Sequence, residues 1–198
     1  MPSLKEVQHY LTGLWLLFLQ DAKGFGYLDL SDRGMVRSFW AIAWAAPSIL
    51  ISWMWWRSAF LGARPDGATA GSLFYFRLAL VEAANWIVPL ILAGMLCLML
   101  RLGGKFPAIV VASNWLAVPV SYLYAGLIVA MMLVPSLAGA VTLLWLVAML
   151  VVVGALFRIL RTICGEQLLT IAAFTMVLLV PAMIFSEVLE RYLDVFPN

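Results

Sequence analysis

Residues 74–100 form an apolar run that is long enough to cross a bilayer as a helix, yet it contains Glu82, Asn85 and Pro89. A charged group at the centre of a membrane helix costs about 2.5–3.5 kcal/mol on insertion scales. We therefore expect Glu82 and Asn85 to be buried against other helices. The stretch predicts one member of a helical membrane bundle.

The composition of the chain supports a membrane environment. Of its 198 residues, 65% are hydrophobic and 11% are charged, whereas about a quarter are charged in a typical soluble domain. The predicted fold is all-α and polytopic, with residues 36–192 forming a bundle of five transmembrane helices. The predicted spans are 36–56, 74–100, 107–134, 137–157 and 167–188.

Residues 1–35 are predicted to hold an amphipathic helix and a connector. At helical spacing, one face of residues 4–20 is apolar and the other is polar. Two placements remain open, one in the membrane interface with Tyr10 and Trp15 near the headgroups, the other against the cytoplasmic end of the protein itself. The apolar face comprises Leu4, Val7, Leu11, Leu14, Trp15 and Phe18, and the polar face comprises Lys5, Glu6, His9, Thr12 and Gly13.

Two connectors carry local signals. In residues 21–35, Asp29 or Ser31 is a plausible N-cap for the helix that follows. After the first span, the sequence RPDG at 64–67 predicts a turn.

The distribution of basic residues predicts the orientation. Five spans place alternate loops on opposite sides, and eight Lys and Arg residues then share the side of the N-terminus against four on the other side. Positively charged loops stay in the cytoplasm. We therefore expect a cytoplasmic N-terminus. As a separate expectation, the membrane is a bacterial inner membrane.

A polar layer is predicted around Glu82. At 100° per residue, Glu82 and Asn85 share a face of their helix. The threading places polar residues of the third and fourth spans at a similar depth: Ser121, Tyr122, Tyr124 and Thr142. The layer is interpreted either as a protonatable site or solute path, or as a hydrogen-bonded Glu82 that fixes helix registry.

Two further patterns concern packing and lipid contacts. The third span carries small residues every four positions, which favours close approach of a helix from this chain or another copy: Ser113, Ala117, Ser121 and Ala125. Basic residues flank the cytoplasmic loops and are candidate contacts for anionic lipid headgroups, or determinants of topology alone: Arg101, Lys105, Arg158 and Arg161.

The sequence lacks the motifs of common enzymes and cofactor sites. The two cysteines, Cys97 and Cys164, predict neither a disulfide framework nor a metal site, and His9 is the only histidine. There is no zinc-protease motif, P-loop or dinucleotide glycine pattern. We expect no enzymatic activity, no cofactor and no nucleic-acid partner.

The second half of the chain resembles the Yip-domain family, the Ypt-interacting proteins and their bacterial relatives. The resemblance rests on LGGKFPAIVVASNWLAVPVSYLYAGLIVAMMLVP at 102–135 and on the glycine- and leucine-rich fourth span. It implies a glycine-rich loop, a mid-span proline at Pro119, a tight hairpin and five helices after a cytoplasmic segment. Eukaryotic members bind small prenylated GTPases in vesicle trafficking, but this chain lacks their long N-terminal region.

The functional prediction is a non-enzymatic membrane protein, either membrane-organising, an adaptor or an accessory subunit of a membrane complex. Its expected partners are the lipid bilayer and other membrane proteins or further copies of the chain. The alternative is a small transporter or channel that uses the Glu82 and Asn85 layer.

Overall fold

The computed structural model describes residues 1–64 and 69–196, so most of the predicted RPDG turn lies outside the described residues. It confirms an all-α fold in which a short N-terminal helix precedes five helices long and apolar enough to cross a membrane. These helices are α3 (Ala41–Gly62), α4 (Ser72–Met99), α5 (Phe106–Leu133), α6 (Ala138–Cys164) and α7 (Leu168–Tyr192). The chain is a multi-pass helical membrane protein.

The shorter elements precede or connect the long helices. They are α1 (Leu4–Phe18), η1 (Ala22–Tyr27), α2 (Asp32–Ser38), η2 (Gly103–Lys105) and η3 (Pro135–Leu137). The Ser31 hydroxyl accepts a hydrogen bond from the Gly34 N–H and caps α2, as one of the two predicted candidates. A short break around Phe39 and Trp40 separates α2 from α3, inside the predicted 36–56 span.

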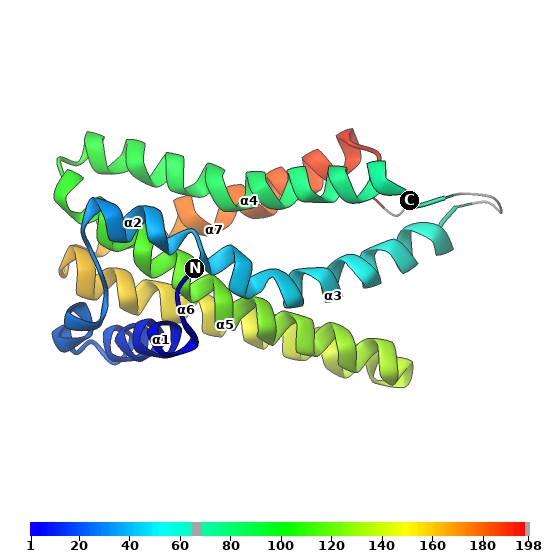
Figure 1. Cartoon of the computed structure of the whole chain (residues 1–198), viewed down its shortest axis with the longest axis horizontal. Helices are drawn as coiled ribbons and strands as arrows, with labels where there is room; N and C mark the ends of the chain where they lie inside the picture. The colour runs from blue at the N-terminus through cyan, green and yellow to red at the C-terminus, as the bar shows by residue number, and fades with distance from the viewer. Residues whose placement is uncertain (65–68, 197–198) are drawn as a thin grey trace.

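The long helices form two layers. Helix α4 packs along α7 in one layer, while α3 packs along α5, and α5 packs along α6, in the other. Figure 1 shows the α4 and α7 pair above α3, α5 and α6. The α6 and α7 helices join the layers, whereas α4 and α5 pack much less closely against each other.

Helix α6 extends seven residues beyond the predicted 137–157 span. The predicted loop that would carry Arg158 and Arg161 is helical as far as Cys164. Its last turns are buried through Leu160 and Ile163, which belong to the main hydrophobic core. Packing of this apolar side against α1 explains why the helix continues past the basic residues that suggest its end.

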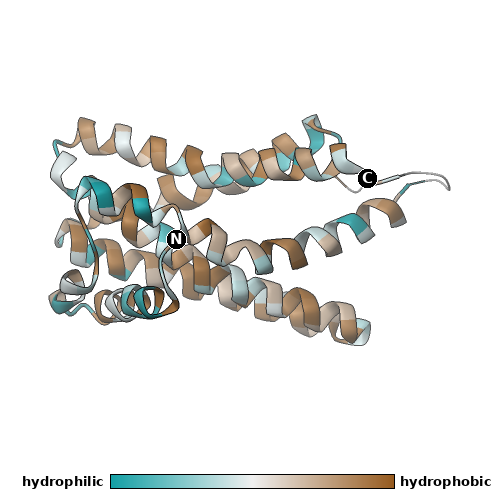
Figure 2. Ribbon diagram, viewed as in Figure 1, coloured by the Kyte–Doolittle hydropathy of each residue, from teal (hydrophilic) through white to brown (hydrophobic). Residues whose placement is uncertain are grey.

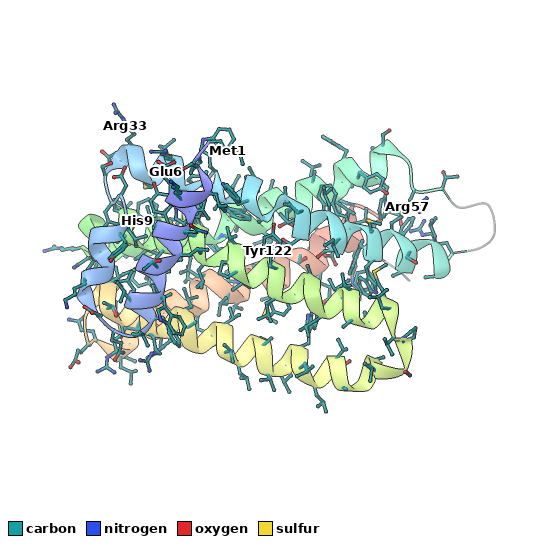
Figure 3. All side chains as sticks on the ribbon, turned by 60° about the horizontal axis from the view of Figure 1, so that its bottom comes forward. Met1, Glu6, His9, Arg33, Arg57 and Tyr122 are labelled. Atoms are coloured by element: carbon teal, nitrogen blue, oxygen red, sulfur yellow. The ribbon has the colours of Figure 1, made fainter. Side chains whose placement is uncertain are left out.

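The two ends of the bundle differ in composition. Figure 2 shows hydrophilic residues gathered on α1 and α2 at one end, and near the C-terminal ends of α3 and α7 at the other. In Figure 3, α1 crosses the long helices at the end where Glu6, His9 and Arg33 lie, and Arg57 lies toward the opposite end. We call these the α1 end and the tail end.

At the tail end, the segment after α7 closes the space between the two layers. Val195 is fully buried with Phe60 of α3 and Phe74 of α4. The Trp56 indole N–H donates to the Val195 carbonyl oxygen at 3.0 Å. Arg64 pairs with Asp194, and its hydrogen bond holds the pKa of that carboxyl below the usual range.

Helix α1 packs on the bundle through a well-defined apolar side. The Tyr10 ring stacks on Trp115 of α5 with 4.7 Å between ring centroids. Two side chains of α6 cap the end of α1: the Arg158 Nε donates to the Phe18 carbonyl at 2.7 Å and the Thr162 hydroxyl donates to the Leu17 carbonyl at 3.1 Å. Two placements of the N-terminal helix were left open by the sequence, one in the membrane interface and one against the protein itself. In the structure, α1 packs against the protein itself.

A close glycine contact fixes η1 beside α1. A Cβ atom at Gly13 would lie 2.7 Å from the Cβ of Tyr27, and one at Gly24 would lie 2.6 Å from the Gly13 carbonyl oxygen. Side chains are excluded at both positions by these distances. Gly13 is therefore buried, although helical periodicity places it on the polar face of α1.

Glu6 ties the start of α1 to α2. Its carboxylate accepts a hydrogen bond from the Ser3 backbone N–H and forms an ion pair with Arg37. The Ser3 N–H, followed by Arg37, holds the pKa of Glu6 below its usual value. Because the folded state favours the carboxylate, this contribution to α1 docking is present near neutral pH and is lost as the pH falls through the lowered pKa.

An apolar stripe on α1 remains uncovered by the described residues. Trp15 is 60% exposed and Leu4 is 59% exposed, and Leu11 beside them is partly buried against the core. At 100° per residue, this stripe lies opposite Gly13 and therefore opposite η1. Figure 1 shows η1 at the very end of the bundle, so the stripe faces back toward the apolar middle of the long helices. We expect it to contact the lipid boundary.

A fluorescence quenching measurement tests this placement. A bimane label at Trp15→Cys and a matched label at the exposed Thr12→Cys are compared in liposomes, with Cys97 and Cys164 replaced by Ala. Nitroxides near the glycerol end of the lipid chains should quench the label at position 15 much more strongly, because only that face meets the acyl region. Equal quenching of the two labels would contradict the placement.

Candidate functional site

A cavity of about 300 Å³ lies between the two helix layers, and all five long helices contribute to its wall. Helices α4 and α5, which pack less closely against each other than their other neighbours do, both line it. Most of the wall is apolar, formed by side chains such as Ile49, Val120, Leu156 and Leu178. Its polar side chains come from α4 and α5: Glu82, Asn85, Trp86, Ser113, Asn114 and Ser121.

Glu82 lies deep in the bundle. It follows Ser72, the first residue of α4, by ten residues, or about 15 Å along the axis at 1.5 Å per residue. Within residues 1–64 and 69–196, the carboxylate forms no hydrogen bond or ion pair with a protein group. Its side chain lines the cavity, where a ligand or water can supply a partner.

Two other polar atoms in the cavity wall are also unpartnered. They are the Asn85 side-chain oxygen and the Ser113 hydroxyl oxygen, both buried and without a hydrogen-bond partner in the described structure. Buried polar groups are nearly always hydrogen-bonded, so each such exception requires an explanation. Both atoms are enclosed by neighbouring protein atoms, so Glu82 is the unpartnered group that this structure offers to a ligand in the cavity.

The amide nitrogen of Asn85 has a different environment from its oxygen. It donates to the Ser186 hydroxyl of α7 at 3.3 Å, and Ser186 donates to the Glu190 carboxylate at 2.7 Å. The sequence places Glu190 near the end of the last span, and the structure brings it into a polar chain because α7 continues to Tyr192. The i,i+4 spacing of Ser186 and Glu190 is the signal that could have revealed this link.

A second polar network is fully paired. The Trp86 indole N–H donates to the Asn114 side-chain oxygen at 2.9 Å, and the Asn114 amide donates to Ser38 at 2.8 Å. Ser38 donates in turn to the Met35 carbonyl oxygen at 2.7 Å. This buried chain links α4, α5 and α2 at the α1 end of the cavity. It provides the registry role that one interpretation assigns to Glu82.

The predicted polar layer is divided by the structure. Glu82, Asn85 and Ser121 line one cavity. Tyr122 turns to α3 and donates to the Trp44 carbonyl, and in Figure 3 it lies midway along the bundle. The Tyr124 ring packs edge-on against Trp145. Within the residues that the structure describes, the Thr142 hydroxyl donates to the Ala138 carbonyl of its own helix.

The reason for this division is the rotation of the α-helix. The predicted layer was defined by depth, and depth does not determine which side of a helix a residue occupies. One residue turns the side chain by about 100°, so Tyr122 and Tyr124 leave the face that Ser121 presents to the cavity.

The small-residue ladder of α5 serves two surfaces within the same chain. Ser113 and Ala117 line the cavity. Ser121 accepts a hydrogen bond from Ser48 of α3 at 2.8 Å, and Ala125 is buried. The close packing expected from the ladder occurs between α3 and α5.

The candidate lipid contacts also separate into two groups. Arg158 caps α1, and Arg161 pairs with Glu166 at 2.8 Å. Arg101 and Lys105 are exposed at the α1 end. Headgroup binding by these four residues stays a prediction. Among the described residues, no group of three His, Cys, Asp or Glu side chains is placed to hold a metal ion.

No family model, curated protein or solved structure matches the chain. The Yip-domain resemblance therefore stays a prediction.

Unfolding measurements distinguish the paired network from the unpaired site. Asn114→Leu should lower the free energy of unfolding by on the order of 1–3 kcal/mol, because it leaves the Trp86 indole N–H without a partner and removes the hydrogen bond that Ser38 accepts. Glu82→Gln should change it by less than about 0.5 kcal/mol, because no protein contact is lost. Denaturant titration in detergent measures both. A large loss for Glu82→Gln would show that Glu82 fixes helix registry.

Proposed function

We propose that this protein is a non-enzymatic transporter that binds a small organic cation, an apolar body with an amine or guanidine group, in the cavity around Glu82. The observation that carries the proposal is Glu82, a carboxylate that lines the cavity and has no hydrogen-bond or ion-pair partner in the described part of the chain. A ligand that donates hydrogen bonds and carries positive charge supplies the partner that this carboxylate lacks. An unpaired buried carboxylate is otherwise costly.

The shape of the cavity favours an organic cation over a bare metal ion. Its volume of about 300 Å³ is at the lower end of the roughly 300–1,000 Å³ found for small-molecule sites. Apolar side chains of α3, α5, α6 and α7 form most of its wall. An apolar ligand body fills this space, whereas a metal ion prefers a shell composed mainly of oxygen atoms.

The two-layer architecture gives a route for movement. At the α1 end, the Trp86–Asn114–Ser38 network joins the layers, and at the tail end the Val195 cluster joins them. Release to either side requires one of these contacts to separate. Prolines inside four of the long helices remove backbone hydrogen bonds and ease bending: Pro47, Pro89, Pro119 and Pro181.

The membrane-organising or adaptor function stays a prediction, and we place transport ahead of it. The adaptor prediction relied in part on the small-residue ladder of α5. In the structure, these residues contact α3 and line the cavity of the same chain. For orientation, we propose a cytoplasmic α1 end in a bacterial inner membrane. The orientation rests on the basic residues at that end, including Arg33 of α2 and, in the connection between α4 and α5, Arg101 and Lys105.

Binding is tested with benzylguanidinium and its uncharged isostere benzylurea, measured by calorimetry on the purified protein. The protein should bind the cation more tightly, and Glu82→Gln should weaken that binding by about tenfold or more, because the charge partner is lost. Glu187→Gln, an exposed carboxylate of α7, is the control and should leave the affinity unchanged. Equal binding of the two probes by the parent protein would contradict the proposal.

Transport is tested separately in proteoliposomes. Uptake of radiolabelled benzylguanidinium should exceed that of empty liposomes and should fall to their level in Glu82→Gln. Tight binding without uptake would limit the function to ligand binding and remove the transport step.

A further inference from the structure

Glu82 is the single ionisable side chain in the described wall of the cavity. The other residues that line it are apolar or carry a neutral amide, indole or hydroxyl group. A cation and a proton that enter this space therefore depend on the same carboxylate for a charge partner. Because one positive charge neutralises this carboxylate, binding of either one opposes binding of the other.

The charged side chains of the neighbouring elements do not serve as counter-ions for Glu82. On α7, Arg191 pairs with Glu187. The Glu190 carboxylate accepts a hydrogen bond from the Ser186 hydroxyl. The charged residues of α6 lie in its last two turns, at the α1 end. The other charged or titratable groups near α4 contact other residues or lie toward an end of the bundle: Arg57 of α3, Tyr75 and Arg77 of α4, Lys105 of η2, and Tyr122 and Tyr124 of α5.

We propose that the protein exchanges the organic cation for a proton, and that the two bind in turn to the Glu82 carboxylate. This inference rests on the proposed transport of a small organic cation. A buried carboxylate without a partner is neutralised by a proton, because its charged form is costly outside water. An arriving cation replaces the proton as the neutralising partner, so the proton is released.

The exchange balances in atoms and in charge. The O–H bond of the protonated Glu82 carboxyl breaks, its electron pair stays on the oxygen, and the proton leaves to water. The guanidinium or ammonium group keeps its own protons and forms an ion pair with the carboxylate. Both bound states are neutral, whereas the bare carboxylate is the costly state within the bilayer. The protein therefore changes access with a proton or a cation bound, and one cation crosses for each proton that crosses in the opposite direction.

Proton release is measured by calorimetry on the purified full-length protein, with benzylguanidinium as the probe. Titrations at mildly acid pH in buffers of different ionisation enthalpy give the number of protons released per cation bound. The parent protein should release close to one proton, and its affinity should rise by up to about tenfold per pH unit. Glu82→Asp, which keeps the carboxyl group, should retain the release, and Glu82→Gln should bind weakly without it. Glu187→Gln should behave as the parent protein.

Exchange is measured in proteoliposomes that are acid inside and contain a pH-sensitive dye. External benzylguanidinium should be taken up above its equilibrium level, and the internal pH should rise as protons leave. Because the exchange is electroneutral, a membrane potential set with potassium and valinomycin should leave the initial rate unchanged. Glu82→Gln should abolish the uptake and the pH change, and benzylurea should cause no pH change in the parent protein.

The outcomes separate this inference from the proposed function. Cation binding that releases no proton, or uptake that is independent of the pH gradient, would overturn the exchange and leave cation binding at Glu82 in place. Proton release on binding, without a pH change in proteoliposomes, would also overturn the exchange. If the parent protein does not prefer benzylguanidinium to benzylurea, the proposed function and the inference both fail.

Discussion

Hydrogen bonding in the absence of water is the constraint on which this structure depends. In lipid, a polar group that finds no protein partner keeps the full cost of its desolvation. The chain treats its buried polar residues in two ways. Trp86, Asn114 and Ser38 satisfy one another and connect three helices. Glu82, Asn85 and Ser113 line a shared cavity, and the Glu82 carboxylate has no protein partner among the described residues. The first group explains how the helices are held together. The second explains why we propose a ligand for the cavity.

The cavity exists because the helices pair unequally. Helix α4 packs along α7 and stays apart from most of α5, so the face of α4 that carries Glu82 meets space instead of side chains. The layers meet again at both ends, through Asn114 at one and Val195 at the other. The proposed transport requires one of these two contacts to separate at a time, and this connects the packing to the proposal.

The sequence predicts the number and approximate positions of the long helices, because hydropathy and length are properties of each segment alone. It also identifies Glu82 and Asn85, whose cost in lipid is visible without a structure. It groups Tyr122, Tyr124 and Thr142 with Glu82, whereas in the structure these three residues have other contacts. The side of a helix that faces a given neighbour depends on how the helices are rotated in the bundle, and depth alone does not determine it. The same limit applies to Ser186 and Glu190, which become relevant only once α7 is known to lie beside α4.

The central claim is that the cavity is accessible and selects cations through Glu82. The most direct measurement is the rate at which thiol reagents modify Ser113→Cys in proteoliposomes, with Cys97 and Cys164 replaced by Ala. Two methanethiosulfonates of similar size are compared, one carrying an ethylammonium group and one an ethylsulfonate group. The account predicts that the cationic reagent reacts faster and that Glu82→Gln lowers the ratio of the two rates by about tenfold, as expected for loss of one strong charge contact. An unchanged ratio, or no reaction with either reagent, would contradict it.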